Sequence, residues 1–236
     1  MDQLLTTYAF DASQGLETLR DFIVMGGPAM WAIAVVSVLM TTLILWKVWQ
    51  LMWFGAWSGG RRSARALAFW AQGQQDEARI CLAGRRSLRA RLLRAAMDSA
   101  ADPGLSEADA KTETARQARA LLAQARSGLR GLELAATIGP LLGLLGTVTG
   151  MIAAFQALQE AGARADPSAL AGGIWEALLT TAAGMAVAIP AQIALTWFES
   201  VVDRLRHDME DTATRVFIGA APAATQAKPV VAAAAE

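Results

Sequence analysis

The stretch GGIWEALLTTAAGMAVAIPAQIALTWF, residues 172–198, is long and apolar enough to cross a membrane. A helix of about 20 residues spans a hydrocarbon core of roughly 30 Å. Two other stretches reach this length, residues 29–54 and 134–158, and the quoted stretch extends to residues 170–198. Their length favours helices over buried strands. The sequence therefore predicts an all-α integral membrane protein with three transmembrane helices.

Basic residues are distributed unevenly along the chain. Of its 21 Lys and Arg residues, fourteen lie between Gly55 and Arg130 and four follow Phe198. The segment before residue 29 and the loop 159–169 hold one each. Since basic residues beside membrane spans remain in the cytoplasm, we expect the large loop and the C-terminus inside. The N-terminus and the short loop are then expected outside.

The first span carries markers of a membrane interface at its inner end. Trp46, Trp49 and Trp53 fit an aromatic belt, and the amine of Lys47 can extend toward the polar headgroups. Residues 1–22 lack the basic region of a signal peptide, so none is expected. They fit either a helix on the membrane surface or a loosely ordered lead-in.

The large loop is expected to be helical. Ser106, followed by two acidic residues, is a candidate N-cap, and we predict one long helix from Ser106 through the second span. The basic run GRRSLRARLLR, residues 84–94, fits a solvated cytoplasmic loop near anionic lipid better than a nucleic-acid site. The low-complexity residues 219–236 are predicted to be a disordered tail.

Residue types for enzyme chemistry are scarce. The chain has one cysteine, Cys81, and one histidine, His207, too few for a metal site or a Cys/His pair. It has no Walker motif and no dinucleotide-binding motif. We predict no enzymatic activity, no metal and no cofactor.

The third span has two different faces. With Glu176 set at 0° on a wheel of about 100° per residue, Thr180, Gly184 and Thr181 fall between roughly 40° and 140°. The large apolar side chains fall on the opposite arc, which suits lipid. A charge at the bilayer centre costs about 2.5–3.5 kcal/mol, and less for Glu176 because it lies near the outer end. Snorkelling or protonation of Glu176 is one interpretation, and a role in ion movement or partner binding is the one we favour.

The second span has one face of small residues, Gly139, Gly143, Gly146 and Gly150, spaced by four, three and four. Such faces, together with Gly184 in the third span, let helix backbones approach closely in lipid. Pro140 and Pro190 are expected to kink their helices. Thr147 borders the glycine face. Thr147 and Thr181 either bond back to a carbonyl of their own helix or serve a polar path.

Two motifs, TIGPLLGLLGTVTGMIAAF (residues 137–155) and GGIWEALLTTAAGMAVAIPA (residues 172–191), resemble the MotA/TolQ/ExbB proton channel family. The resemblance covers roughly residues 134–198. The expected three-span topology is similar to that of ExbB and TolQ, since MotA proteins have four spans. The chain departs from typical ExbB and TolQ sequences in a slightly shorter entry, TIGPLLG, and in Trp175 before the glutamate.

The resemblance implies a pentameric ring around two copies of a single-span partner, ExbD-like or TolR-like, whose aspartate binds and releases protons. Thr147, Thr181 and the neighbouring Thr180 would line the proton path, and Glu176 would lie near its outer end. We expect an ExbB-like subunit of a proton-driven motor in the bacterial inner membrane, acting with a TonB-like protein. A TolQ-like subunit of the Tol-Pal system and a non-conducting membrane scaffold are the alternatives. The coupling ion, proton or sodium, stays open.

The expected division of the chain follows from these points. It consists of a periplasmic N-terminal segment (1–28), the first span (29–54), a helical cytoplasmic loop (55–133), the second span (134–158), a short periplasmic loop (159–169), the third span (170–198), a cytoplasmic helix (199–218) and the tail (219–236).

Overall fold

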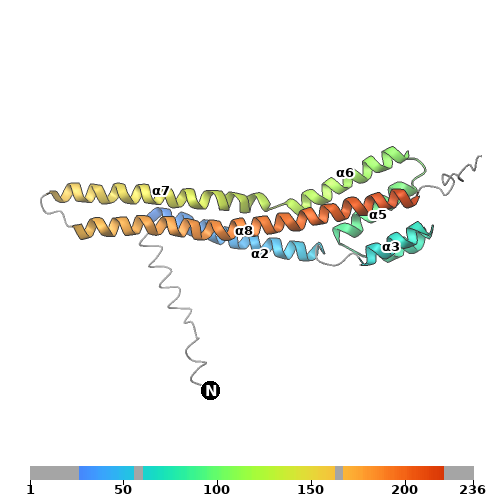
Figure 1. Ribbon diagram of the computed structural model, residues 1–236, viewed down its shortest axis with the longest axis horizontal. Coiled ribbons are helices and arrows are strands. Elements are labelled where there is room, and N and C mark those ends of the chain that lie inside the picture. The colour runs from blue at the N-terminus through green and yellow to red at the C-terminus, as the bar shows by residue number, and fades with distance from the viewer. Residues whose placement is uncertain (1–26, 56–60, 163–166, 221–236) are drawn as a thin grey trace, which may run out of the picture. The chain divides into compact units, whose positions relative to one another are not determined.

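The computed structural model describes residues 27–55, 61–162 and 167–220, and the regular structure in these ranges is helical (Figure 1). The helices are α2 (Gly27–Trp53), α3 (Arg61–Ala71), α4 (Gln75–Leu82), α5 (Leu88–Ala101), α6 (Glu107–Arg126), α7 (Leu129–Ala161) and α8 (Pro167–Ala220). Helices α2, α7 and α8 each contain a stretch long and apolar enough to span a membrane. The prediction of an all-helical chain with three membrane helices is confirmed. The expectations for residues 1–22 and for residues 221–236 of the tail lie outside the described residues.

The chain divides into two compact units. The first unit, called the membrane unit here, comprises the chain up to Lys47 and residues Gly128–Phe198. The second, called the loop unit, comprises Val48–Ser127 and the chain from Glu199 onward. Helices α2 and α8 contribute to both units, and α8 is continuous over its 54 residues.

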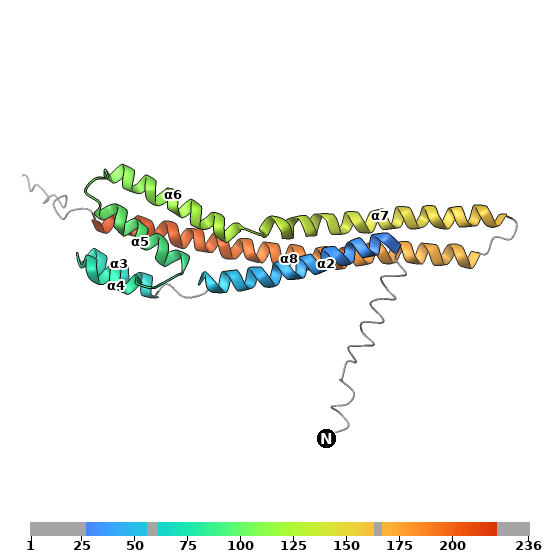
Figure 2. The same cartoon turned by 180° about the vertical axis from the view of Figure 1, so that it is seen from behind.

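Within the membrane unit, α7 lies antiparallel beside α8, as both views show (Figures 1 and 2). Small residues make this close approach possible. Helix α2 also runs antiparallel to α7: Ala29 lies beside Gly146 near one end of the unit, and Trp46 lies beside Gly128 near the other. The three membrane helices therefore pack directly on one another.

The expected single helix from Ser106 through the second span is not observed. Ser106 does cap α6, because its hydroxyl accepts a hydrogen bond from the Asp109 N–H at 3.2 Å. However, α6 ends at Arg126 and α7 begins at Leu129. Between them Gly128 adopts a left-handed conformation with φ of 82°. Glycine adopts this conformation without steric cost, so Gly128 acts as a helix breaker.

The loop unit is held together by two apolar clusters. One joins α3, α4 and α5 to the end of α8, where the buried Trp70 indole N–H donates to the Val216 carbonyl at 3.0 Å. The other joins α5 and α6 to the middle of α8 through Leu92, Leu121 and Leu205. The C-terminal part of α8 therefore has the apolar partners that a helix outside a membrane requires.

Lys47 differs from the sequence prediction. Its side chain is 1% exposed, whereas a snorkelling lysine would extend its amine into the polar headgroup region. The expectation of a snorkelling lysine is therefore wrong. Sequence position alone placed the residue near the end of the span, but packing of the chain encloses it.

Candidate functional site

Helices α7 and α8 meet along a seam of small residues. A Cβ atom added to Gly143 would lie 2.9 Å from the Thr181 Cα, and one added to Gly139 would lie 2.9 Å from the Gly184 carbonyl oxygen. Further along, a Cβ on Gly150 would lie 3.2 Å from the Ala177 Cβ. Such distances leave no room for a side chain, so the backbones are in direct contact. We call this contact the glycine seam.

Thr181 lies on the glycine seam and bonds across it. Its hydroxyl donates to the Gly143 carbonyl of α7 at 3.1 Å, and its side chain is half-buried. Because α7 is a regular helix here, the same carbonyl is the acceptor for the backbone N–H of Thr147. A hydroxyl donates one hydrogen bond and retains lone pairs that accept others. Thr181 therefore has acceptor capacity left beside the seam.

Thr180 is enclosed more completely than its neighbour. Its side chain is 2% exposed, and its hydroxyl donates to the Ala177 carbonyl of its own helix at 2.7 Å. The Gly143 carbonyl lies 3.5 Å from the same hydroxyl. A Cβ on Gly146 would lie 2.5 Å from the Thr180 hydroxyl oxygen. Thr180 thus fills the space that Gly146 leaves open.

Thr147 forms a hydrogen bond within its own helix, which is the first of the two predicted possibilities. Its hydroxyl donates to the Leu144 carbonyl at 2.7 Å, and the side chain is half-buried. The two threonines therefore behave differently: Thr181 bonds between helices and Thr147 within one. Thr181 contacts Gly143 across the seam, and Thr147 lies four residues after Gly143 on α7, so the two residues are about one helical turn apart along the seam.

Glu176 lies five residues before Thr181, toward the N-terminal end of α8. It is half-buried, and one carboxylate oxygen would lie 3.9 Å from a Cβ on Gly27, at the start of α2. Glu176 is thus near the end of the membrane unit at which α2 begins. Five residues of α8, more than one helical turn, separate Glu176 from Thr181, so these two side chains are not adjacent along the helix.

The two arcs of the third span differ in exposure. The buried residues Ala177, Thr180 and Ala188 are each at most 7% exposed, and they belong to the small arc. The exposed large side chains belong to the opposite arc: Trp175, Leu178, Met185, Ile189 and Ile193. Pro190 lies inside α8 and Pro140 inside α7. The arrangement presents a polar and small surface to the helix contacts and an apolar surface outward.

The polar groups at the seam are hydroxyls and backbone carbonyls. Among residues 27–55, 61–162 and 167–220, no group of three or more His, Cys, Asp or Glu side chains is placed to hold a metal ion. What the site offers is hydroxyls and backbone carbonyls, which exchange hydrogen bonds with water and do not bind protons tightly.

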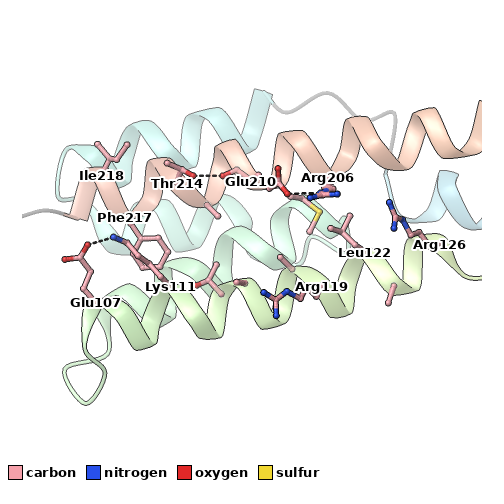
Figure 3. A pocket seen from close by; sticks show the side chains of 16 residues that line it. Glu107, Lys111, Arg119, Leu122, Arg126, Arg206, Glu210, Thr214, Phe217 and Ile218 are labelled. Carbon is pink, nitrogen blue, oxygen red and sulfur yellow. Dashed lines mark hydrogen bonds and ion pairs between the residues drawn. The ribbon is translucent and has the colours of Figure 1, made fainter.

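The sequence analysis missed a groove in the loop unit, between α6 and the C-terminal part of α8 (Figure 3). The groove has a volume of about 1040 Å³. Its floor includes Ala118 and Leu122 of α6 and Met209, Ala213 and Phe217 of α8. These residues recur at intervals of four along each helix, which is the spacing of one helical face. That spacing is the signal from which the groove was predictable.

Charged side chains surround the groove, and four of them form ion pairs within their own helices. Lys111 donates to Glu107 at 2.5 Å, and Arg206 donates to Glu210 at 2.8 Å. The hydrogen bond from Lys111 lowers the pKa of Glu107, and the one from Arg206 lowers the pKa of Glu210. Lys111 also lies 5.8 Å from the centre of the Phe217 ring. These pairs keep the carboxylates ionised around an apolar floor.

Comparison with known proteins adds independent information. The sequence pattern of the MotA/TolQ/ExbB proton channel family matches residues 85–211, more than half of the chain. The chain is 41% identical over 90 residues to the biopolymer transport protein exbB1 of Vibrio cholerae, a match covering 36% of this chain and 40% of that protein. It is 46% identical over 90 residues to a putative ExbB-like biopolymer transport protein of Synechocystis, covering 37% of this chain and 34% of the relative.

A relative named for a different system matches as well. The chain is 41% identical over 73 residues to the Tol-Pal system protein TolQ of Haemophilus influenzae, which covers 31% of this chain and 32% of TolQ. The chain thus spans at most about 40% of the length of these three relatives.

Proposed function

Because the chain belongs to the MotA/TolQ/ExbB proton channel family, we propose that it is an ExbB-like subunit of a motor driven by the proton-motive force in the bacterial inner membrane. With an ExbD-like partner it would energise TonB-dependent transport across the outer membrane. The observation that carries this proposal is the Thr181 hydroxyl, which lies half-buried on the glycine seam and bonds across it to Gly143.

In this proposal the proton path runs beside the glycine seam. Thr181 and Thr147 lie within about one turn of Gly143, and both are half-buried rather than sealed in a core. Thr180 lies on the same arc and is buried against α7, so it would form part of the wall of the path. Glu176 lies toward the N-terminal end of α8, which is the outer end of the path in the predicted topology.

The proposal requires a partner that supplies the proton-binding carboxylate. Within the predicted spans 29–54, 134–158 and 170–198, the sequence holds one acidic residue, Glu176, and no aspartate. Hydroxyls alone do not change charge at neutral pH. A single-span ExbD-like or TolR-like protein with an aspartate in its membrane segment would complete the path.

A ring of five copies around this partner is the assembly that we propose. The exposed apolar side chains of α7 include Leu141, Leu144, Leu145 and Val148, close in sequence to the threonine and glycine positions. In a membrane such surfaces contact either lipid or another helix. The native mass of the complex purified with its partner would distinguish five copies with two partner chains from a monomer or dimer.

The test of the path is the substitution Thr181→Val. Valine keeps nearly the same shape but removes the hydroxyl. An interhelical hydrogen bond in a membrane contributes about 0.6 kcal/mol on average, so we expect the complex to assemble. The growth of cells on an iron chelate that requires energised uptake should be lost. Thr149→Val is the matched control, since the Thr149 hydroxyl donates to carbonyls of its own helix, Leu145 and Gly146.

The outcomes separate the proposals. Normal uptake by the assembled Thr181→Val complex would remove Thr181 from the path. Equal loss in both variants would point to helix packing and favour a non-conducting scaffold.

The similarity to TolQ favours one alternative function, a subunit of the Tol-Pal envelope system. A strain lacking the chain would then show detergent sensitivity and cell chaining rather than iron starvation. Such a strain, complemented with the Thr181 variant, would test both roles in one background.

A further inference from the structure

A second pocket lies in the loop unit, where the first membrane helix ends. It has a volume of about 400 Å³ and is lined by Trp53, Phe54, Arg85, Arg86, Arg91 and Arg94. Two aromatic side chains and four guanidinium groups therefore surround one space. We call these residues the arginine pocket.

Two hydrogen bonds to backbone carbonyls hold the residues of the arginine pocket together. The Leu88 N–H, at the start of α5, donates to the Phe54 carbonyl at 3.3 Å. Arg94 reaches back and donates through Nη2 to the Arg85 carbonyl at 2.7 Å. The end of α2 and the residues before α5 are thus joined, so the arginines stay beside the aromatic residues.

The four arginines have no carboxylate partner in the described part of the chain, residues 27–55, 61–162 and 167–220. Other arginines of the loop unit do form ion pairs there, with Asp98, Asp208, Glu113, Asp203, Glu210 and Asp211. Arg85, Arg86 and Arg91 are exposed. The arginine pocket is therefore a concentration of positive charge that the described residues leave uncompensated.

The length of α2 is close to the thickness of a bilayer with its headgroups. Helix α2 has 27 residues, which corresponds to ~40 Å at 1.5 Å per residue. A bilayer including its headgroup regions is about 40–45 Å thick. Trp53 is the last residue of α2, so an α2 that begins at the outer headgroups would bring the adjoining arginines to the level of the inner phosphate groups.

The neighbouring surface of α2 suits acyl chains. Trp49 and Trp53 stack with their ring centres 6.2 Å apart. Both rings and Met52 are more than half exposed. Tryptophan at this level has an apolar ring for the chains and an N–H for the headgroup. A free phosphate ion would use the arginines but would leave this apolar surface unused.

We propose that the arginine pocket binds the phosphate of an anionic phospholipid, with the acyl chains along Trp49, Met52 and Trp53. The guanidinium groups match phosphate oxygens in pairs of hydrogen bonds. The bound lipid would anchor the start of α5, and with it the loop unit, to the membrane surface. This site is separate from the glycine seam, and it does not depend on the proposed motor function.

The test is a titration of phosphatidylglycerol into the full-length chain purified in detergent, with bound lipid counted by native mass spectrometry. In the variant R85Q/R86Q we expect about a 30-fold loss of apparent affinity, the equivalent of about 2 kcal/mol for two arginines. The control R62Q/R65Q removes two charges from α3 of the same loop, outside the pocket, and should bind as the unchanged protein does. Phosphatidylcholine should bind weakly to all three.

Two further measurements test whether the pocket recognises a phospholipid or a free anion. R85K/R86K keeps both charges but loses the paired hydrogen bonds, so its affinity should lie between those of the unchanged protein and R85Q/R86Q, and it keeps the proposal testable if the glutamine variant does not fold. Equal affinity of R85Q/R86Q and R62Q/R65Q would overturn the proposal. So would displacement of the lipid by excess inorganic phosphate, which would assign the pocket to a free anion.

Discussion

Replacing Gly143 with alanine should push α7 and α8 apart. The new Cβ would lie 2.9 Å from the Thr181 Cα, 3.0 Å from the Thr180 carbonyl oxygen and 3.3 Å from the Thr181 carbonyl oxygen. Favourable carbon contacts are about 3.5–4.0 Å. All three neighbours are backbone atoms, so no rotation of a side chain relieves the clash, and the helices themselves must separate by several tenths of an ångström.

The loss of stability in Gly143→Ala is estimated by comparison with a matched control variant. Gly172, which lies inside α8, has nothing within 4 Å of an added Cβ, so Gly172→Ala gains the helix propensity of alanine, about 1 kcal/mol, without a clash. Gly143→Ala has the same gain but adds an overpacking cost of about 1–3 kcal/mol. It also weakens the Thr181–Gly143 hydrogen bond, about 0.6 kcal/mol. The two variants should differ by about 2–3 kcal/mol.

The assay is reversible unfolding by sodium dodecyl sulfate in mixed micelles, followed by circular dichroism and tryptophan fluorescence. The free energy of unfolding should fall for Gly143→Ala and stay level or rise for Gly172→Ala. Equal free energies of unfolding for the two variants would refute the argument, because they would mean that the backbones do not touch at Gly143.

Two further predictions concern the ends and surface of the helices. Gly128 (φ 82°) and Gly84 (φ 70°) both adopt left-handed conformations, so alanine at either position costs about 1–2 kcal/mol. A Cβ at Gly128 also lies 2.7 Å from the Trp46 ring whereas Gly84 has open space, and thermal unfolding should show Gly128→Ala to be the less stable by about 1 kcal/mol. Hydrogen bonds from Arg116 and a neighbouring amide lower the pKa of Glu113 from 4.5 to about 2. The stabilisation from this ionised carboxylate is complete above pH 4.5 and is lost as the pH falls toward 2. Glu113→Gln should therefore lower the stability slightly near neutral pH and flatten its decline between pH 4.5 and 2.

Much of the membrane unit was predictable from the sequence, because a membrane imposes strong rules on composition. Only a helix of sufficient length satisfies its own backbone hydrogen bonds in lipid, so three long apolar stretches predict three helices. The helical wheel also predicted which face of the third span is buried. Ala177 and Thr180 on the small arc are buried, and Leu178 and Ile193 on the opposite arc are exposed. Periodicity records which side of a helix faces away from lipid.

Periodicity does not record what a side chain meets on that side. The sequence left open whether Thr147 and Thr181 bond within their own helices. In the structure Thr147 does, and Thr181 donates to Gly143 of the neighbouring helix instead. The difference depends on the register of α7 against α8, which the close contacts of Gly139 and Gly143 determine.

The other differences between the sequence prediction and the structure also arise from contacts between helices. Gly128 was expected to be tolerated inside one long helix, and the burial of Lys47 was not expected. The gathering of Arg85, Arg91 and Arg94 beside Phe54 depends on a hydrogen bond between residues far apart in sequence. By itself, the sequence determined which segments are helices and which faces are apolar, since these follow from local composition and spacing. The tertiary structure alone decided the partners of the polar groups that bond between helices, such as Thr181 with Gly143, because these depend on contacts between segments distant along the chain.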